Sequence, residues 1–149
     1  MSFSPKLSFS IFLLFHLCSV MKATTPPSNK WLEPYRVTIT NQDVPVVLLR
    51  CDDLDASLLK PGNSTSWKFR KNFWESNQYG CRFYWVDDNF VLQKHADFTV
   101  FDDQVANTLC GTDGYNMNRC YWYVTRDGFY YSKNDGSDWN LLHGWNNIG

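Results

Sequence analysis

Few side chains in this chain could act as acid–base catalysts. Of its three histidines, His16 lies in an apolar N-terminal segment, and only His95 and His143 lie beyond it. Two histidines and a lysine could perform acid–base chemistry of the ribonuclease kind, but no catalytic motif surrounds either histidine. The sequence also lacks a Gly-x-Ser-x-Gly nucleophile motif. We therefore expect a protein that is not an enzyme.

Acidic residues gather in short clusters that superficially suggest calcium ligands. The segment Asn134–Asp138 lacks the Asp-x-Asp ladder and the terminal Glu of an EF-hand loop. The clusters Asp52–Asp55, Asp87–Asp88 and Asp102–Asp103 are typical of charged turns that keep strand ends in water. The sequence thus predicts no metal and no cofactor.

The N-terminus predicts secretion. Lys6 precedes an apolar run from Leu7 to Val20, and Lys22-Ala23 follows it, which is the pattern of a cleaved signal peptide. The run is too short to span a bilayer, which takes about 20 apolar residues. We expect residues 1–23 to be a signal peptide, 24–34 an extended proline-containing leader and 35–149 a single domain, with no membrane insertion.

Charge and cysteine content follow from this division. Removing residues 1–23 takes away two lysines and no acidic residue, so the mature chain is more acidic than the whole chain, whose formal charge is −1. This balance argues against a nucleic-acid partner. Cys51, Cys81, Cys110 and Cys120 remain, an even number that predicts two disulfides in a secreted chain. Three pairings are possible; we favour Cys51–Cys81 and Cys110–Cys120.

Alternation of apolar and polar residues predicts strands throughout the mature chain. The expected strands are Tyr35–Asn41, Val44–Cys51, a central hairpin within Ser64–Val86, one long or broken strand from Phe90 to Phe101, and Asn118–Thr125 followed by a turn at Arg126–Gly128. We expect Asp102–Met117 to be a long loop. No apolar period of 3.6 residues persists for three turns, so the predicted fold is all-β: a small, disulfide-stabilised antiparallel β-sandwich.

Two kinds of surface site are also predicted. Asn63-Ser64-Thr65 is an N-glycosylation sequon beside a Pro-Gly turn, so Asn63 could carry an N-glycan. Tyr84, Tyr121 and Tyr123 could stack on sugar rings if they are exposed, although in a sandwich we expect them to face a second sheet.

The order of these segments resembles the plant self-incompatibility S-protein family, whose founding members are secreted by the poppy stigma. The resemblance covers roughly residues 35–131 and is carried by Val37-x-Ile39-x-Asn41, Cys51-Asp52-Asp53-Leu54-Asp55, Leu59-x-Pro61-Gly62, Trp67-x-Phe69, Asn72-Phe73-Trp74, Cys81-x-Phe83-x-Trp85, Phe98-x-Val100-Phe101-Asp102, and Cys120-x-Trp122 followed by Asp127-Gly128.

The resemblance implies a small secreted β-sandwich with two disulfides that acts as a ligand for a membrane protein of another cell, through hydrophilic surface loops. The alternatives are an extracellular carbohydrate- or wall-binding module and a small hydrolase that uses His95 or His143. The candidate recognition residues in the loops are Asp52, Asp53, Asp55, Asp87, Asp88, Asn89, Asp102, Asp103 and Asp113.

Overall fold

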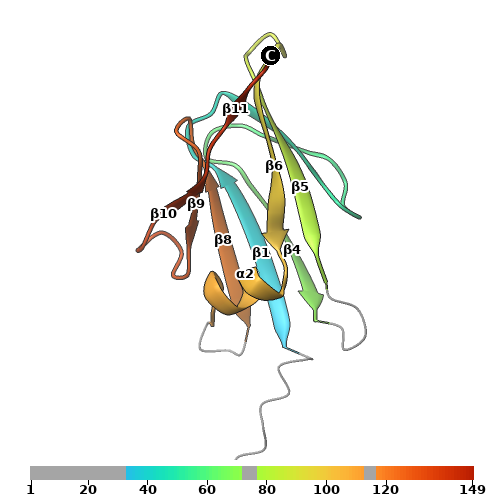
Figure 1. Ribbon diagram of the computed structural model, residues 1–149, viewed down its shortest axis with the longest axis vertical. Coiled ribbons are helices and arrows are strands. Elements are labelled where there is room, and N and C mark those ends of the chain that lie inside the picture. Colours follow the sequence, from blue (N-terminus) through green and yellow to red (C-terminus); the bar gives the residue numbers. More distant parts are fainter. Residues whose placement is uncertain (1–32, 72–76, 113–116) are drawn as a thin grey trace, which may run out of the picture.

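Two β-sheets pack face to face in the computed structural model, which describes residues 33–71, 77–112 and 117–149 (Figure 1). The predicted signal peptide and nearly all of the leader lie outside the described residues. The β1 sheet has the order β10 (Asn140–His143), β9 (Phe129–Ser132), β8 (Asn118–Val124), β1 (Pro34–Asn41) and β4 (Ser64–Arg70), with β7 (Gly111–Thr112) paired to β8. The β5 sheet has the order β11 (Asn146–Asn147), β6 (Leu92–Phe101), β5 (Tyr79–Val86), β2 (Val46–Cys51) and β3 (Ser57–Leu59).

The alternation of the sequence matches the two faces of these strands. Buried and half-buried residues alternate along all of β1, with Val37 and Ile39 fully buried. On β4, Trp67 and Phe69 pack against the core, whereas Lys68 and Arg70 are exposed. Because successive side chains of a strand point to opposite faces, these patterns give each sheet one apolar face, and the predicted all-β sandwich is confirmed.

The predicted central hairpin is wrong. Its two strands form as expected, but β4 pairs with β1, whereas β5 pairs with β2 and β6. The chain therefore crosses from one sheet to the other between Arg70 and Tyr79. The inward faces of both strands meet the same core, and the rings of Phe69 and Tyr79 lie 5.0 Å apart. Alternation reports which face of a strand is buried and carries no information about its hydrogen-bonding neighbour.

Other differences from the sequence-based expectation are local. β1 and β8 run parallel, although every other pairing in the described segments is antiparallel. Phe90–Phe101 contains one continuous strand, β6, whose register runs unbroken through Ala96. Part of the expected loop 102–117 is a short helix, α2 (Asp103–Thr108), and the short strands β3, β7, β10 and β11 were not expected. Elements of two to six residues are too short for a strand or helix periodicity of apolar residues to be recognised in the sequence.

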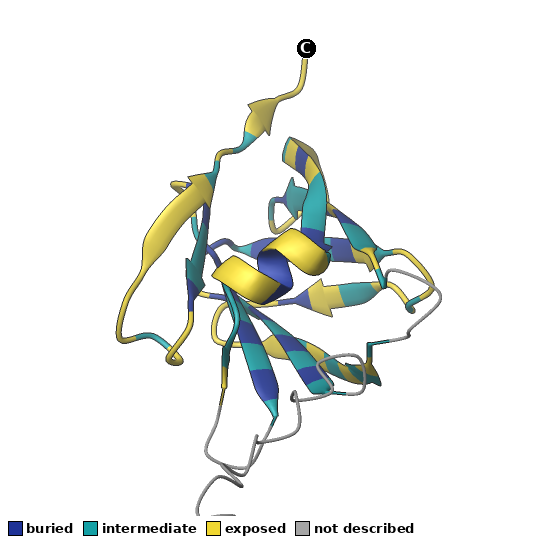
Figure 2. Cartoon of the chain, turned by 60° about the horizontal axis from the view of Figure 1, so that its bottom comes forward, coloured by how far each residue is buried: buried dark blue, intermediate teal, exposed yellow. Residues whose placement is uncertain are grey.

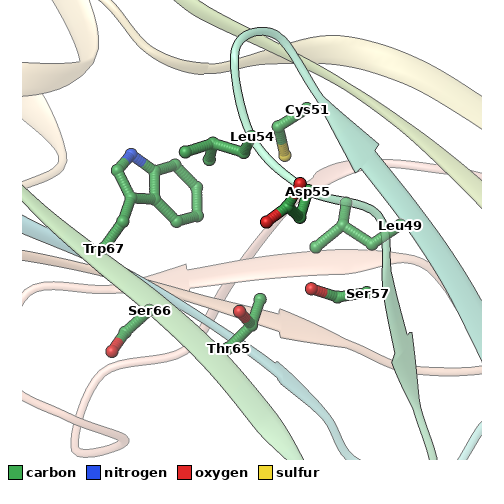
Figure 3. A pocket seen from close by; sticks show the side chains of 8 residues that line it. All are labelled: Leu49, Cys51, Leu54, Asp55, Ser57, Thr65, Ser66 and Trp67. Carbon is green, nitrogen blue, oxygen red and sulfur yellow. The ribbon is translucent and has the colours of Figure 1, made fainter.

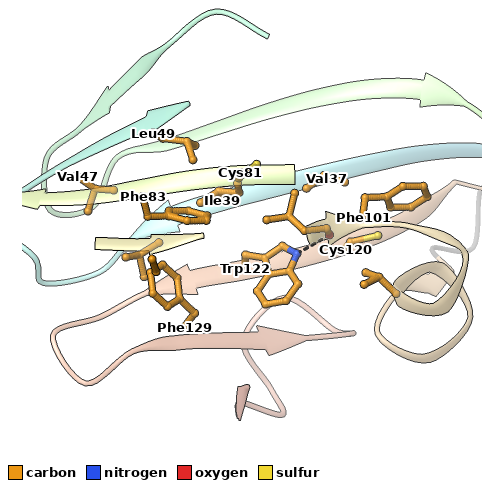
Figure 4. Packing of buried hydrophobic residues seen from close by; sticks show 14 of the residues in the cluster. Val37, Ile39, Val47, Leu49, Cys81, Phe83, Phe101, Cys120, Trp122 and Phe129 are labelled. Carbon is orange, nitrogen blue, oxygen red and sulfur yellow. Dashed lines mark hydrogen bonds between the residues drawn. The ribbon is translucent and has the colours of Figure 1, made fainter. Parts of the chain in front are cut away.

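The core is aromatic. The largest fully buried side chains are Trp122, Phe83, Phe101 and Phe129, drawn from strands of both sheets (Figure 4). Trp122 of β8 donates its indole N–H to the carbonyl oxygen of Val100 on β6 at 3.0 Å, so one buried side chain links the two sheets by packing and by a hydrogen bond. Helix α2 adds Val105 and Ala106 to this core and exposes its other side (Figure 2).

Two disulfides join the pairs favoured from the sequence. Cys51 and Cys81 occupy opposite positions of β2 and β5. Cys110 follows α2 and is bonded to Cys120 on β8. Cys51 is the last residue of β2, so its bond fixes the point at which the loop 52–56 begins. The bond of Cys110 ties the segment between α2 and β8 to β8. The disulfides thus anchor two of the segments that hold predicted recognition residues.

Candidate functional site

The predicted recognition loops lie at two opposite ends of the sandwich. Cys51 at the end of β2 is paired with Cys81 near the start of β5, whereas Val46 at the start of β2 is paired with Val86 at the end of β5. The loop after Cys51 and the start of α2 therefore lie at one end, and the β5–β6 turn at the other (Figure 1). One flat partner surface cannot contact all of these loops at once.

At the α2 end, two of the predicted carboxylates shape the backbone. Asp52 accepts a hydrogen bond from the N–H of Gly80 at 2.9 Å. Asp102 caps α2 by accepting from the N–H of Val105 at 2.7 Å, which satisfies one of the free donors of the first helical turn. Both carboxylates therefore help to hold the backbone; Asp52 is exposed and Asp102 is half-buried, and their role in recognition stays a prediction.

Three other predicted residues at this end are exposed. Asp53 has a φ of 57° in the loop after β2, and Asp55 is exposed beside it. Asp103 is exposed and forms an ion pair of 2.7 Å with Lys71. Asp113 lies outside the described residues. The α2 end thus presents acidic groups in several short segments.

A cleft opens between the edges of the two sheets near Asp55. It has a volume of about 170 Å³, and Figure 3 shows Trp67 of β4 on one side, with Leu49 and Cys51 of β2 on the other and Asp55 nearby. The Trp67 indole nitrogen is buried and has no hydrogen-bond partner. The cleft contains one carboxylate and no second titratable catalytic group among its lining residues, so it offers no acid–base pair.

The side chains of His95 and His143 lie on opposite sides of the β5 sheet. His95 is paired with Tyr84 and lies on the outward face of the β5 sheet. His143 lies on the inner side, where its ring stacks on Phe98 with centroids 4.1 Å apart, and burial lowers its pKa. Because His95 and Phe98 belong to opposite faces of β6, the two imidazoles cannot share a substrate.

Neither a metal cluster nor a spanning helix occurs in the described part of the chain. No three His, Cys, Asp or Glu side chains there come together as metal ligands. None of the helices in those segments is long and apolar enough to cross a membrane.

At the opposite end, Asp87 organises a tight β5–β6 turn. Its Oδ1 accepts hydrogen bonds from the N–H groups of Asn89 and Val91, each at 2.9 Å. Its Oδ2 accepts from the side-chain amide of Gln93 at 3.0 Å. The backbone N–H of Asp87 also donates to the carbonyl oxygen of Val91 at 3.0 Å. One residue thereby fixes the whole turn, and Asp88 and Asn89 remain exposed.

This turn holds Phe90 in water. Phe90 is 67% exposed and has a φ of 60°, a left-handed conformation that bulky residues rarely adopt. Val91 and Leu92 are exposed beside it. Ile148 is also exposed and directly follows Asn147, which is paired with Lys94 of β6. The turn and the adjacent C-terminal strand thus form an apolar tip, defined here as Phe90, Val91, Leu92 and Ile148.

The sequence did not predict this tip. The sequence predicts a turn at Asp87-Asp88-Asn89 and places Phe90 in the strand that follows. Asn tolerates the left-handed region better than Phe, so Asn89 would be the expected residue for that conformation. The structure places Phe90 there, and its exposure depends on hydrogen bonds that only the folded turn reveals.

The sequon lies on an exposed turn. Asn63 donates its N–H to the carbonyl oxygen of Lys60, and its own carbonyl oxygen accepts from the N–H of Asn41, both at 2.9 Å. Its side chain is exposed. Such a position suits N-glycosylation, which stays a prediction.

The tyrosines considered for sugar binding point away from the core. Tyr121 and Tyr123 lie opposite Thr38 and Thr40 on the outward face of the β1 sheet, and the expectation that they face a second sheet is wrong. Tyr123 is covered by Trp139, with ring centroids 3.7 Å apart. Burial and a hydrogen bond of 2.9 Å to Asp135 raise the pKa of Tyr123 above its ordinary value. Tyr121 is half-buried.

Known proteins share this sequence pattern and fold. A family model described as plant self-incompatibility protein S1 matches residues 36–145. S-protein homolog 24 of Arabidopsis thaliana is 31% identical over 114 residues, which cover 74% of this chain and 68% of that protein. S-protein homolog 2 of the same plant is 27% identical over 95 residues, covering 64% of this chain and 54% of that protein. The matched segment is thus only about half the length of homolog 2.

A solved structure shows the same fold. It is described as that of SPH (Self-Incompatibility Protein Homologue) proteins, a widespread family of small, highly stable, secreted proteins from plants. It superimposes with a TM-score of 0.51 at 13% identity and covers 76% of this chain and 96% of that one.

Proposed function

The chain belongs to the plant self-incompatibility protein S1 family, and we propose that it is a secreted, non-enzymatic ligand for a cell-surface protein. Its role would be in signalling of the self-incompatibility type or another receptor-mediated kind. Its contact surface is the apolar tip of the β5–β6 turn. Asp88 and Asn89 form a polar rim beside that tip.

The observation that carries the proposal is the rigid exposure of Phe90. A soluble protein gains nothing in stability from an aromatic ring that is 67% exposed on a left-handed backbone. The turn instead costs conformational energy, which Asp87 offsets with its three side-chain hydrogen bonds. Strained backbone held in place by the surrounding structure is a mark of functional sites.

The tip has the composition of a protein-binding surface. Exposed apolar groups rimmed by polar residues mark protein interaction sites, and aromatic anchors dominate the energy of many interfaces. Because the turn is held by hydrogen bonds before any partner arrives, its ordering cost on binding is small. The predicted residues Asp87, Asp88 and Asn89 thereby take two roles: Asp87 shapes the turn, and the other two flank the anchor.

A catalytic role has weaker support. The two histidines lie on opposite faces of the β5 sheet, and the cleft beside Asp55 holds a single carboxylate. We accordingly assign no catalytic residue.

Proximity labelling tests the proposal. The mature protein, fused to a labelling enzyme, is applied to plant cell surfaces together with a Phe90→Ala variant and a Leu58→Ala variant. Leu58 is 46% exposed and lies on β3, at the edge of the β5 sheet. We expect the original protein and Leu58→Ala to label the same membrane protein and Phe90→Ala to lose it. Labelling of wall polysaccharide alone, or equal labelling by all three, would refute the proposal.

A further inference from the structure

Basic side chains line up across the outward face of the β1 sheet. Arg36 on β1 is paired with Lys68 of β4 on one side and with Arg119 of β8 on the other. Neighbouring strands lie about 4.8 Å apart, so three cationic side chains stand next to one another in a chain whose formal charge is −1. Like charges in directly opposite positions destabilise a sheet. An anionic ligand beside these three side chains would reduce their mutual repulsion.

A hollow continues this row of cations. It has a volume of about 210 Å³ and lies between β7 and the segment after β9. Its lining residues are Gly111, Thr112, Arg119, Tyr121, Lys133 and Asn134. Among the described residues, this lining has two cations, two hydroxyl groups, one amide and no carboxylate. Arg119 Nη1 donates to the hydroxyl oxygen of Tyr121 at 3.5 Å, which places the guanidinium beside the aromatic ring.

Glycine is required in the wall of this hollow. A Cβ atom at Gly111 would lie 2.5 Å from the carbonyl oxygen of Lys133, closer than any real contact. The close approach of β7 to the chain after β9 brings Lys133 to the same hollow as Arg119. Two features thus bring the cations together: the pairing of neighbouring strands and the close backbone packing at Gly111.

Three carboxylates in the described part of the chain accept hydrogen bonds from neighbouring polar side chains. Glu33 accepts a hydrogen bond from the side-chain amide of Asn118 at 2.9 Å. Asp135 accepts from the Tyr123 hydroxyl at 2.9 Å, and Asp138 from the Ser132 hydroxyl at 2.7 Å. Within the described residues, none of these carboxylates lines the hollow. The Nε of Arg36 is buried and has no hydrogen-bond partner.

We propose that this basic face, defined as Arg36, Lys68, Arg119, Tyr121 and Lys133, binds an acidic polysaccharide whose sugars carry carboxylates. An arginine fork binds a carboxylate through two parallel hydrogen bonds. The hydroxyl and amide groups of Thr112 and Asn134 suit sugar hydroxyls, and the Tyr121 ring offers a stacking surface. A row that crosses three strands fits an extended polymer better than a single small anion. The site is separate from the apolar tip and does not rest on the receptor proposal.

The test measures binding of the mature protein to oligogalacturonate of one length, in calcium-free buffer, by calorimetry. The test variant is the double Lys68→Gln, Arg119→Gln. The matched control is Arg50→Gln, Arg82→Gln, which removes the same charge from two residues paired on the outward face of the β5 sheet. Circular dichroism melts establish that both variants fold. Phe90→Ala is included because its binding should equal that of the original protein.

The face variant should weaken binding about tenfold or more, as expected for the loss of two charge-assisted contacts, and the control variant less than about threefold. Binding should also disappear when the oligogalacturonate is fully methyl-esterified. Tyr121→Ala should weaken binding and Tyr121→Phe restore it. Equal loss in both double variants, no binding by the original protein, or binding to phosphatidylserine vesicles in place of oligogalacturonate would each overturn the proposal.

Discussion

At position 90, the residue type and the backbone conformation are in conflict. A left-handed conformation costs an ordinary L-residue about 1–2 kcal/mol, and Phe90 adopts it with most of its ring in water. By contrast, Asp52, Asp87 and Asp102, which were predicted to be recognition residues, accept hydrogen bonds from backbone N–H groups. The sequence shows which residues are acidic, but the partner of each carboxylate depends on how turns and distant strands come together.

Phe90→Asn should raise the stability of the fold while it removes the anchor. Asn tolerates the left-handed region, and little packing is lost from an exposed ring, so we expect the free energy of unfolding to rise by about 1 kcal/mol. Phe90→Ala, which keeps the steric conflict, should gain nothing. Urea denaturation of the original protein and both variants measures this. If Phe90→Asn proves less stable than Phe90→Ala, the assigned strain is contradicted.

His143 should make the fold less stable in acid. Burial lowers its pKa in the folded protein, so the unfolded chain takes up a proton more readily. Its contribution to stability is full above the ordinary histidine pKa of about 6.5 and declines as the pH falls toward the folded value. His143→Phe keeps a ring against Phe98 and removes the titration. Between about pH 7.5 and pH 5.5, on either side of that ordinary pKa, the original protein should lose more stability than the variant; equal losses would show that this imidazole is not responsible.

At the scale of elements, local alternation predicted most strands and their buried faces but not their neighbours. β4 and β5 were recognisable from Trp67, Phe69, Cys81 and Phe83, yet they belong to different sheets. Pairing between β1 and β8 joins residues far apart in the chain, as in Val37 with Cys120. No local pattern encodes such a partner, because it depends on which apolar faces fill the shared core.

Helix α2 depends on its cap more than on its length. Six residues form a marginal helix on their own, and Asp102 supplies the capping oxygen. Asp102→Ala should lower the free energy of unfolding by about 1 kcal/mol. Asp102→Asn should keep most of this contribution to the free energy of unfolding, because Asn caps helices as well as Asp does. If both variants lose the same amount in denaturant melts, the charge of Asp102 matters and the cap does not.

In the whole molecule, the residues that hold the fold together differ from those that form the two proposed binding surfaces. The aromatic core joins the two sheets, and the disulfides tie β2 to β5 and the segment after α2 to β8. A solved structure with only 13% identity shares this fold. The apolar tip lies at one end of the sandwich, and the basic face lies on the outward side of the β1 sheet. Binding at one of these sites therefore does not exclude binding at the other, and substitutions at each should act independently.

If Phe90 anchors a protein partner, as we propose, its removal must lower the affinity of the labelled mature protein for intact plant cells that carry this partner. Saturation binding is measured for the original protein, Phe90→Ala and Leu58→Ala. We expect Phe90→Ala to raise the dissociation constant by about thirtyfold or more, the effect of losing an anchor worth about 2 kcal/mol. Leu58→Ala should change it less than about twofold. Equal dissociation constants for all three proteins would show that Phe90 is not an anchor.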